Sequence, residues 1–335
     1  MAGKAPFSNT FEDTNPGPAV GNREDIESGF NTLIPEDTPA FSSASKVDCR
    51  ARSKDWLVNP LRKPRSQGYP EGEDITTFTD QFDKVAKLSN DIQGFSADFK
   101  VSEVQEAVDS AGPVDYATAE TNARIEVRRD LEYAILSKQD KQLQTSVSTI
   151  YKMRGLGCWL QSDGPADVPE MYRTPATSIY NGSLDTFNEK TLKNLITSVY
   201  KQNGKVNNLT LLCGAALRDV ISDFSRTTEV ASGREAVRSI GYQGSMATIT
   251  NSVDFFKSDH GMISLVNGNP DCMGEEQGFI INQSLYQVGR LIPFNSRELE
   301  RNRGGRRGYI SGWYTLLCLN PLGHGLIDPQ EAQAA

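Results

Sequence analysis

The chain has 335 residues, of which 37% are hydrophobic and 23% charged, and its formal net charge is −8. This length is sufficient for two packed bodies, or for one body with large extensions. A pI near 5.0 excludes a protein whose whole surface coats DNA by counterion release, since that mode of binding needs a basic surface.

The sequence has no targeting, membrane or metal-binding pattern. The amino terminus, MAGKAPFSNTFEDTNPG, lacks the apolar segment of a secretory signal. No apolar run approaches the ~18 residues that a membrane-spanning helix needs. Five cysteines are scattered without a C-x-x-C pair, and the chain has two histidines. We therefore expect reduced thiols, with no disulfide framework, zinc site or membrane partner.

Residues 1–50 differ in composition from a folded domain. Glycine, proline and single aromatic residues occur there without helix or strand periodicity. Such a segment cannot bury enough apolar surface to fold alone. The sequence therefore predicts an extended amino-terminal arm over residues 1–50, held in place by a neighbouring subunit.

Residues 51–100 carry a separated charge pattern. From Arg50 to Arg65 there are six basic residues and one acid, whereas five acids and no base lie between Glu71 and Asp83. The turn-rich stretch KPRSQGYPEG separates the two groups. This pattern predicts a two-stranded arm with a basic outgoing strand and an acidic return strand, each opposite pair contributing ~0.2–1 kcal/mol. Because an isolated ribbon is marginal in water, we expect the arm to lie on another body.

The clearest predicted helix spans residues 115–139, DYATAETNARIEVRRDLEYAILSKQ. Asp115 is a suitable N-cap after the breakers Gly112 and Pro113. Apolar residues recur at three- and four-residue steps and form one stripe: Tyr116, Ala119, Ala123, Val127, Leu131, Ala134 and Ile135. Charged residues are expected on the opposite faces: Glu126, Arg128, Arg129, Asp130 and Glu132. This helix would be ~37 Å long, a length suited to a structural beam.

From residue 184 onward, helical and strand patterns alternate. Helices are predicted over 185–202 and 214–226, the first closed by Asn203-Gly204. Short apolar runs predict strands at LTLLC (209–213), MISLV (262–266), GFIIN (278–282) and YISGWYTLLCLNP (309–321). This order indicates a sheet flanked by helices, which forms a second body.

No catalytic constellation is present. His260 is expected in a turn and His324 in a loop, because no nucleophile motif accompanies either. The glycine-containing stretches RGLG (154–157) and NGNPDCMG (267–274) lack the spacing of phosphate-binding loops and are interpreted as turns. We therefore expect that the protein has no catalytic, cofactor-binding or metal site and is not an enzyme.

The segment KLSNDIQGFSADFKVSEVQEAV, residues 87–108, resembles the return strand of the extended loop in a branch of tailed-bacteriophage major capsid proteins with the Hong Kong 97-type fold. Its pattern L-x-N-x-x-Q-x-F is matched by Leu88, Asn90, Gln93 and Phe95, and V-S-x-x-Q-x-A-V by Val101, Ser102, Gln105, Ala107 and Val108. Other parts of the chain also resemble this family: residues 34–43, Trp56, Glu71-Gly72, and residues 128–136, 254–266 and 319–327. The resemblance thus extends from about residue 34 to residue 327.

The resemblance implies an α+β fold with a Hong Kong 97-like organisation. It assigns an N-arm to 1–50, an E-loop with its return strand to 51–100, and the first part of the P-domain to 101–183, with the spine helix at 115–139. An A-domain would follow over 184–290, and P-domain return strands, an Arg-rich hairpin and the carboxyl terminus over 291–335. The amino-terminal region is shorter than the cleaved scaffolding domain of some relatives, so we expect no proteolytic maturation. No crosslink is predicted at Lys54, Lys63, Lys84 or Lys87.

The function implied is that of a viral structural protein. A major capsid protein of this kind self-assembles as hexamers and pentamers into an icosahedral head shell around double-stranded DNA, which it contacts without sequence specificity. The implied location is the virion, after assembly in the host cytoplasm. Portal, scaffold and cement or decoration proteins are the further partners implied.

The stretch RELERNRGGRR (297–307) contains five arginines. We expect a hairpin between strands of the peripheral body, with Gly304-Gly305 at the turn. Arginine forks bind carboxylates bidentately, so these residues are predicted to contact the acidic return strand of a neighbouring subunit. The candidate interface residues are Trp56, Arg62, Lys63, Arg65, Glu71, Glu73, Asp74, Asp80, Asp83, Arg297, Arg301, Arg303, Arg306 and Arg307. The alternative is a solvated loop paired locally with Glu298 and Glu300.

Two other functions remain open from the sequence. An encapsulin-type compartment has the same fold and would enclose protein cargo. A nucleic-acid-binding protein would use the arginines of 297–307, and its monomer would bind DNA tightly with a steep dependence on salt.

Overall fold

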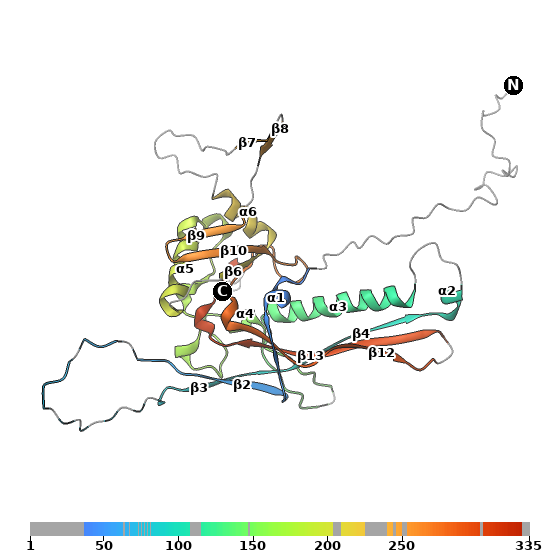
Figure 1. The fold of residues 1–335 in the computed structure, drawn as a ribbon, viewed down its shortest axis with the longest axis horizontal. Coiled ribbons are helices and arrows are strands. Elements are labelled where there is room, and N and C mark those ends of the chain that lie inside the picture. The colour runs from blue at the N-terminus through green and yellow to red at the C-terminus, as the bar shows by residue number, and fades with distance from the viewer. Residues whose placement is uncertain are drawn as a thin grey trace.

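The structure is a computed structural model that describes residues 37–62, 64–66, 68–72, 74, 76, 78, 80, 82–107, 115–146, 148–203, 209–224, 240–243, 246–249, 253–301 and 304–329. Most of the predicted amino-terminal arm, residues 1–36, lies outside the described residues. Two sheets organise the described part, and a long helix lies along one of them (Figure 1).

The four-stranded sheet has the order β1-β12-β13-β4, formed by β1 (Ser45–Asp48), β12 (Tyr286–Leu299), β13 (Arg306–Cys318) and β4 (Gln93–Val101). β12 and β13 form an antiparallel hairpin, β4 pairs antiparallel with β13, and β1 pairs parallel with β12. The strand predicted over 309–321 therefore exists as β13, but its partners are β12 and β4 and not the strands of the second body with which the alternating pattern groups it. Helix α3 (Tyr116–Leu136) lies along this sheet (Figure 1).

Helix α3 confirms the predicted helix, although it ends three residues early. The Asp115 side chain accepts a hydrogen bond from the Thr118 amide at 2.8 Å, as expected of an N-cap. The stripe is buried at Ala123, Val127, Leu131, Ala134 and Ile135. Glu132 was predicted on the outer side and is instead fully buried. The helix stops because Ser137 adopts an extended conformation with ψ 161°.

The second sheet has six strands in the order β5-β14-β11-β6-β10-β9. It contains β5 (Ile179–Tyr180), β14 (Gly325–Ile327), β11 (Gly278–Asn282), β6 (Leu209–Cys213), β10 (Gly261–Asn267) and β9 (Phe255–Ser258). Every residue of β6 and β11 is buried, as their unbroken apolar runs predicted. Helices α5 (Glu189–Asn203) and α6 (Ala215–Asp223) pack their apolar faces on this sheet, so the sheet is flanked by helices as the alternating pattern predicts.

Short elements complete the described chain. Helices α1 (Pro39–Ser43), α2 (Glu103–Ala107) and α4 (Leu156–Trp159) are each one turn or little more. Single 3-10 turns occur at Glu170–Tyr172, Ala176–Ser178, Leu184–Thr186, Gln283–Leu285 and Pro321–Gly323, and a separate ladder joins β7 (Ile240–Gln243) to β8 (Met246–Ile249). None of the described helices is long and apolar enough to span a bilayer.

The predicted two-stranded arm is present, but its pairing differs from the prediction. β2 (Ser53–Val58) pairs antiparallel with β3 (Ala86–Asp91), whereas none of the described residues between 59 and 85 belongs to a strand. The ion pair across the ladder joins Asp55 of the outgoing strand to Lys87 of the return strand at 2.6 Å, opposite in sense to the predicted charge order. The ladder forms at 53–58 and 86–91 because Trp56 and Leu88 there pack on the body, whereas the acidic stretch is exposed at every described position.

The motif that carried the resemblance has a structural explanation. The Asn90 side chain is fully buried and donates to the carbonyl oxygens of Arg154 (3.0 Å) and Leu316 (2.7 Å). Its oxygen accepts from the amides of Arg154 (2.7 Å) and Asp91 (2.9 Å). The Gln93 oxygen accepts from the Met153 amide at 3.1 Å. Asn90 and Gln93 thus attach the base of the arm to β13 and to residues 153–154.

Candidate subunit interface

The described residues of the loop between β2 and β3, residues 59–85, extend away from the rest of the subunit (Figure 1). The loop carries four large apolar side chains in contact with solvent: Leu61 (87% exposed), Tyr69 (85%), Phe78 (83%) and Phe82 (72%). Single exposed apolar residues are ordinary, but several on one projecting loop mark a surface that binds another protein.

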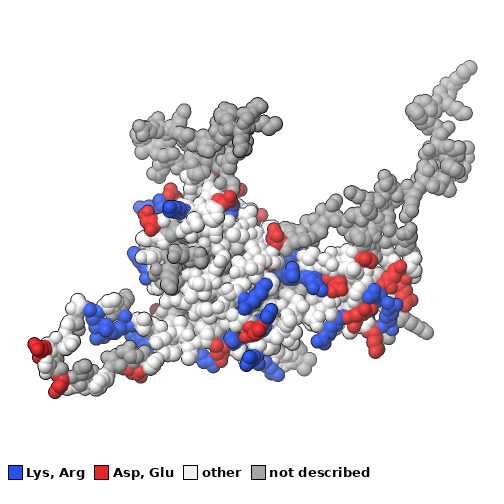
Figure 2. Space-filling view, viewed as in Figure 1, with Lys and Arg blue, Asp and Glu red and all other residues white. Residues whose placement is uncertain are grey.

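The predicted charged residues that the structure describes in this loop are exposed. Arg62 and Arg65 precede the tip, and acidic residues follow it at Glu71, Asp74, Asp80 and Asp83. Figure 2 shows basic atoms on one limb of the loop and acidic atoms at its end. Trp56 lies at the base of the loop, where its ring packs on Trp159 of the same subunit with centroids 5.8 Å apart. Lys63, Glu73 and Arg303 lie outside the described residues.

The Arg-rich stretch forms a hairpin, as predicted, but it joins β12 to β13 of the four-stranded sheet and does not belong to the peripheral body. Arg306 binds Glu298 through two hydrogen bonds of 3.0 and 3.1 Å, and its guanidinium lies 4.0 Å from the ring centroid of Tyr116. The hydrogen bonds from Arg306 hold the pKa of Glu298 below its usual value. Arg307 donates to the Glu300 carbonyl oxygen at 3.1 Å. The local-pairing alternative therefore describes these two arginines within the subunit, whereas Arg297 and Arg301 are exposed.

The turn of this hairpin depends on Gly305, which has a φ of +100°. A Cβ atom there would lie 1.9 Å from the carbonyl oxygen of Val101 in β4. We predict that Gly305→Val lowers the free energy of unfolding by ~2–3 kcal/mol, because strain and a backbone clash add together. Urea unfolding measures the change. Gly68→Val is the matched control, since a Cβ at Gly68 meets no atom within 4 Å; equal stabilities of the two variants would contradict the prediction.

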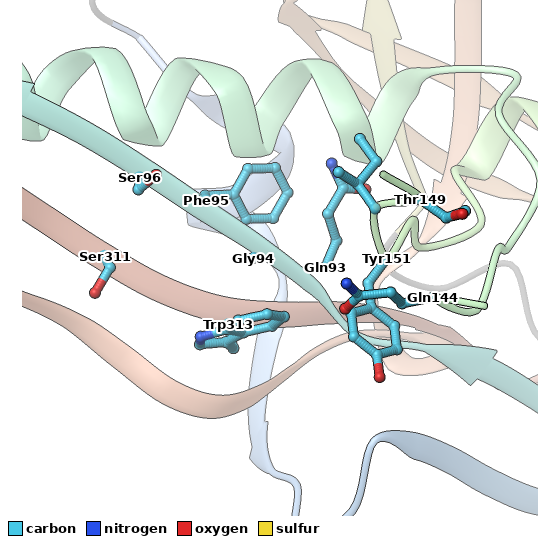
Figure 3. Close-up of a pocket in the computed structure, with 10 residues that line it drawn as sticks. Gln93, Gly94, Phe95, Ser96, Gln144, Thr149, Tyr151, Ser311 and Trp313 are labelled. Atoms are coloured by element: carbon cyan, nitrogen blue, oxygen red, sulfur yellow. The ribbon is translucent and has the colours of Figure 1, made fainter. Parts of the chain in front are cut away.

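The face of the four-stranded sheet that points away from α3 contains a groove of 370 Å³. The groove is lined by Trp313 and Ser311 of β13, by Gly94 of β4 and by Tyr151. Ile150, which also lines it, is 63% exposed. In Figure 3, Phe95 points toward the helix, whereas Trp313 and Tyr151 lie on the other side of β4. Trp313 and Tyr151 pack edge to face with centroids 6.1 Å apart, so the groove has an aromatic wall.

Glu132 lies at a buried site that no sequence pattern indicates. Its two carboxylate oxygens accept hydrogen bonds from the amides of Ala40 and Phe41, each at 2.7 Å. Burial raises the pKa of Glu132 to about 7, although the two amides act in the opposite direction. The sequence around Glu132, between Asp130 and Tyr133 on a charged part of the helix, does not indicate that this side chain is buried. The amides that it binds lie more than ninety residues earlier in the chain.

The two histidines have structural surroundings. His260 lies in the turn between β9 and β10, as predicted, and stacks on Tyr200 with centroids 4.8 Å apart. His324 lies between a 3-10 turn and β14 and is fully buried. Burial lowers the pKa of His324 to about 4, so the ring is neutral and its Nδ1 accepts from the Asn282 amide at 3.2 Å. All five cysteines are buried and free, and no group of described side chains is arranged to bind a metal ion.

The architecture is similar to several solved capsid structures. The capsid of the native GTA particle matches with a TM-score of 0.58 and 13% identity, over 92% of this chain and 95% of that one. Mycobacterium phage Bobi matches with a TM-score of 0.57 and 12% identity, over 89% and 92%. The capsid of cyanophage P-SCSP1u matches with a TM-score of 0.56 and 10% identity, over 97% and 99%. These likenesses establish the Hong Kong 97-type fold and confirm the α+β class.

The comparison with protein families agrees with the fold. No curated protein matches the sequence. The family model described as SU10 major capsid protein matches residues 7–330, which is nearly the whole chain. A structural protein of the viral capsid is the role that this family carries. The chain therefore belongs to the SU10 major capsid protein family.

Proposed function

We propose that this capsid protein builds an icosahedral head shell from hexamers and pentamers of itself, enclosing double-stranded DNA. The proposal is supported by the family match and by similarity to capsids described as whole particles. Within it, residues 1–50 act as the N-arm, 51–100 as the E-loop, 101–183 and 291–335 as the P-domain, and 184–290 as the A-domain. The role is structural, and we propose no enzymatic activity.

The observation that carries the proposal is the exposure of the 59–85 loop. The loop projects away from the subunit, so its large apolar side chains are not buried there: Leu61, Tyr69, Phe78 and Phe82. Burying one such side chain against a second copy contributes ~1.5–3 kcal/mol to the free energy of association. The loop therefore stabilises the contact between two copies strongly. In a closed shell every subunit both presents this loop and receives one, and no apolar loop remains exposed.

The receiving surface that fits best is the outer face of the four-stranded sheet. The groove beside Trp313 and Tyr151 offers an apolar, aromatic surface. Arg297 in β12 and Arg301, two residues after the end of β12, add positive charge, whereas the loop carries acidic residues after its tip. Shape and charge thus favour a loop from a second copy, with Phe78 or Phe82 near the groove and the acids near the arginines.

Electron microscopy of the expressed protein tests the proposed function. Closed hollow particles of uniform diameter are the expected result. A monomer that binds DNA tightly with a steep salt dependence would instead support the nucleic-acid-binding alternative. Shells that copurify with a protein cargo and without genome would support an encapsulin-type compartment. Virion location follows from the capsid role, and assembly in the host cytoplasm with portal, scaffold or cement proteins is part of the proposal.

A charge reversal tests the proposed contact. Reversing Arg306 and Arg307 would be ambiguous, because Arg306 stabilises its own subunit through Glu298 and Tyr116. We predict that Arg297→Glu with Arg301→Glu prevents shell assembly and leaves the unfolding midpoint of the subunit unchanged. Both side chains are exposed, so their replacement disturbs no packing. Lys190→Glu with Lys201→Glu, on the exposed side of α5, is the control with equal charge change; normal shells from the arginine variant would argue against the contact.

A further inference from the structure

The backbone at the base of the amino-terminal arm is held by three buried side chains from three different parts of the subunit. Glu132 of α3 accepts from the Ala40 and Phe41 amides at 2.7 Å each. Tyr286 of β12 donates its hydroxyl to the Ala40 carbonyl oxygen at 3.2 Å, and Asn269 donates its side-chain amide to the Asp37 carbonyl oxygen at 2.9 Å. All three side chains are at most 1% exposed. We call residues 37–41 with these three side chains the arm clamp.

The arm clamp contains an uncompensated acidic group. No lysine or arginine in the described part of the chain forms an ion pair with Glu132, and its hydrogen-bond donors are two neutral amides. The titratable groups that face it are Tyr286 from β12 and Cys272 from the loop after β10, both neutral at physiological pH because burial raises their pKa values. Arg129, three residues before Glu132 on α3, pairs with Asp271 at 2.5 Å. An ionised Glu132 is therefore a buried negative charge without a cation, a costly arrangement.

We propose that Glu132 is a proton-controlled latch, which docks the base of the amino-terminal arm tightly when it is protonated and loosens it when it is ionised. When residues 37–41 leave the clamp, Glu132 becomes exposed to water and ionises freely. Undocking therefore releases the proton, and raising the pH favours the undocked arm.

The pH window follows from the two states of this carboxyl. Its pKa is raised from 4.5 to about 7 in the docked state by burial. The docked state therefore binds the proton more strongly than the exposed one. The stabilisation from the proton is complete below pH 4.5, decreases as the pH rises, and is lost above about pH 7. Between these limits the docking equilibrium changes by a factor on the order of 100.

Hydrogen exchange of the peptide spanning residues 37–43 in the full, unassembled chain tests the latch. Wild type and Glu132→Gln are compared at each pH. The peptide has the same sequence in both proteins, so its intrinsic exchange rates cancel in the ratio of their protection factors. From pH 5 to pH 8 the protection of wild type relative to Glu132→Gln is expected to fall on the order of 100-fold. A ratio that stays constant, or that rises with pH, overturns the proposal.

Two control variants separate the latch from a general loss of packing. Tyr286→Phe removes the hydrogen bond to Ala40, so it is expected to lower protection by the same factor at every pH. Glu126→Gln changes an exposed carboxylate on α3 and is expected to leave the wild-type pH profile intact. If Glu132→Gln does not fold, infrared spectroscopy of the wild-type chain tests the latch instead. A neutral carboxyl band that disappears between pH 6 and pH 8 supports the latch. A spectrum without such a band overturns it.

Discussion

Replacing Phe78 and Phe82 with serine is expected to abolish shell assembly at concentrations where the wild-type chain assembles completely. Both rings are exposed in the subunit, 83% and 72%, so their loss leaves its folded state unchanged. Each ring that becomes covered by a second copy contributes ~2 kcal/mol, and two together contribute ~4 kcal/mol per contact. This loss weakens each contact by a factor on the order of 10³.

The measurement pairs light scattering of the assembly reaction with thermal unfolding of the isolated subunit. Ser66→Ala with Thr76→Ala, two exposed polar positions of the same loop, is the control and should assemble as wild type does. Shells from the double phenylalanine variant at wild-type concentration would show that the loop does not hold the subunits together. A lower unfolding temperature would show instead that the rings pack within their own subunit.

Asn90→Ala is expected to lower the free energy of unfolding by ~3–5 kcal/mol, the largest effect that we predict for the isolated subunit. Truncation leaves four buried backbone groups without a partner: the amides of Asp91 and Arg154 and the carbonyl oxygens of Arg154 and Leu316. Each unpaired group costs ~1–3 kcal/mol, and relaxation of the site makes the sum less than additive. Urea unfolding of the subunit measures the loss.

The matched control for Asn90 is Asn295→Ala. Asn295 lies in β12 and is exposed, so its truncation should change stability by less than ~0.5 kcal/mol. A similar small change at Asn90 would mean that its four hydrogen bonds are replaced by water. The variant also bears on assembly, because Asn90 fixes the base of the arm whose loop is proposed to bind the next subunit.

Much of the proposed interface could not be located from the sequence. The charge separation between Arg50 and Asp83 predicts a two-stranded arm, which exists, but with a different strand pairing. Local charge attraction is weak, ~0.2–1 kcal/mol per pair, whereas packing Trp56 and Leu88 on the body is worth more. The groove beside Trp313 and Tyr151 gave no sequence signal, because its walls come from segments about 160 residues apart.

Elements that depend on local interactions can be predicted from the amino-acid sequence alone. The apolar stripe and the Asp115 cap determine α3, and unbroken apolar runs determine β6 and β11, since the relevant interactions lie within a few turns or residues of each other. Three features depend on long-range packing: Glu132 faces inward, the Arg-rich hairpin belongs to the four-stranded sheet, and β2 pairs with residues 86–91. Each of these depends on which distant segment supplies the partner, and neighbours in the sequence do not encode that choice.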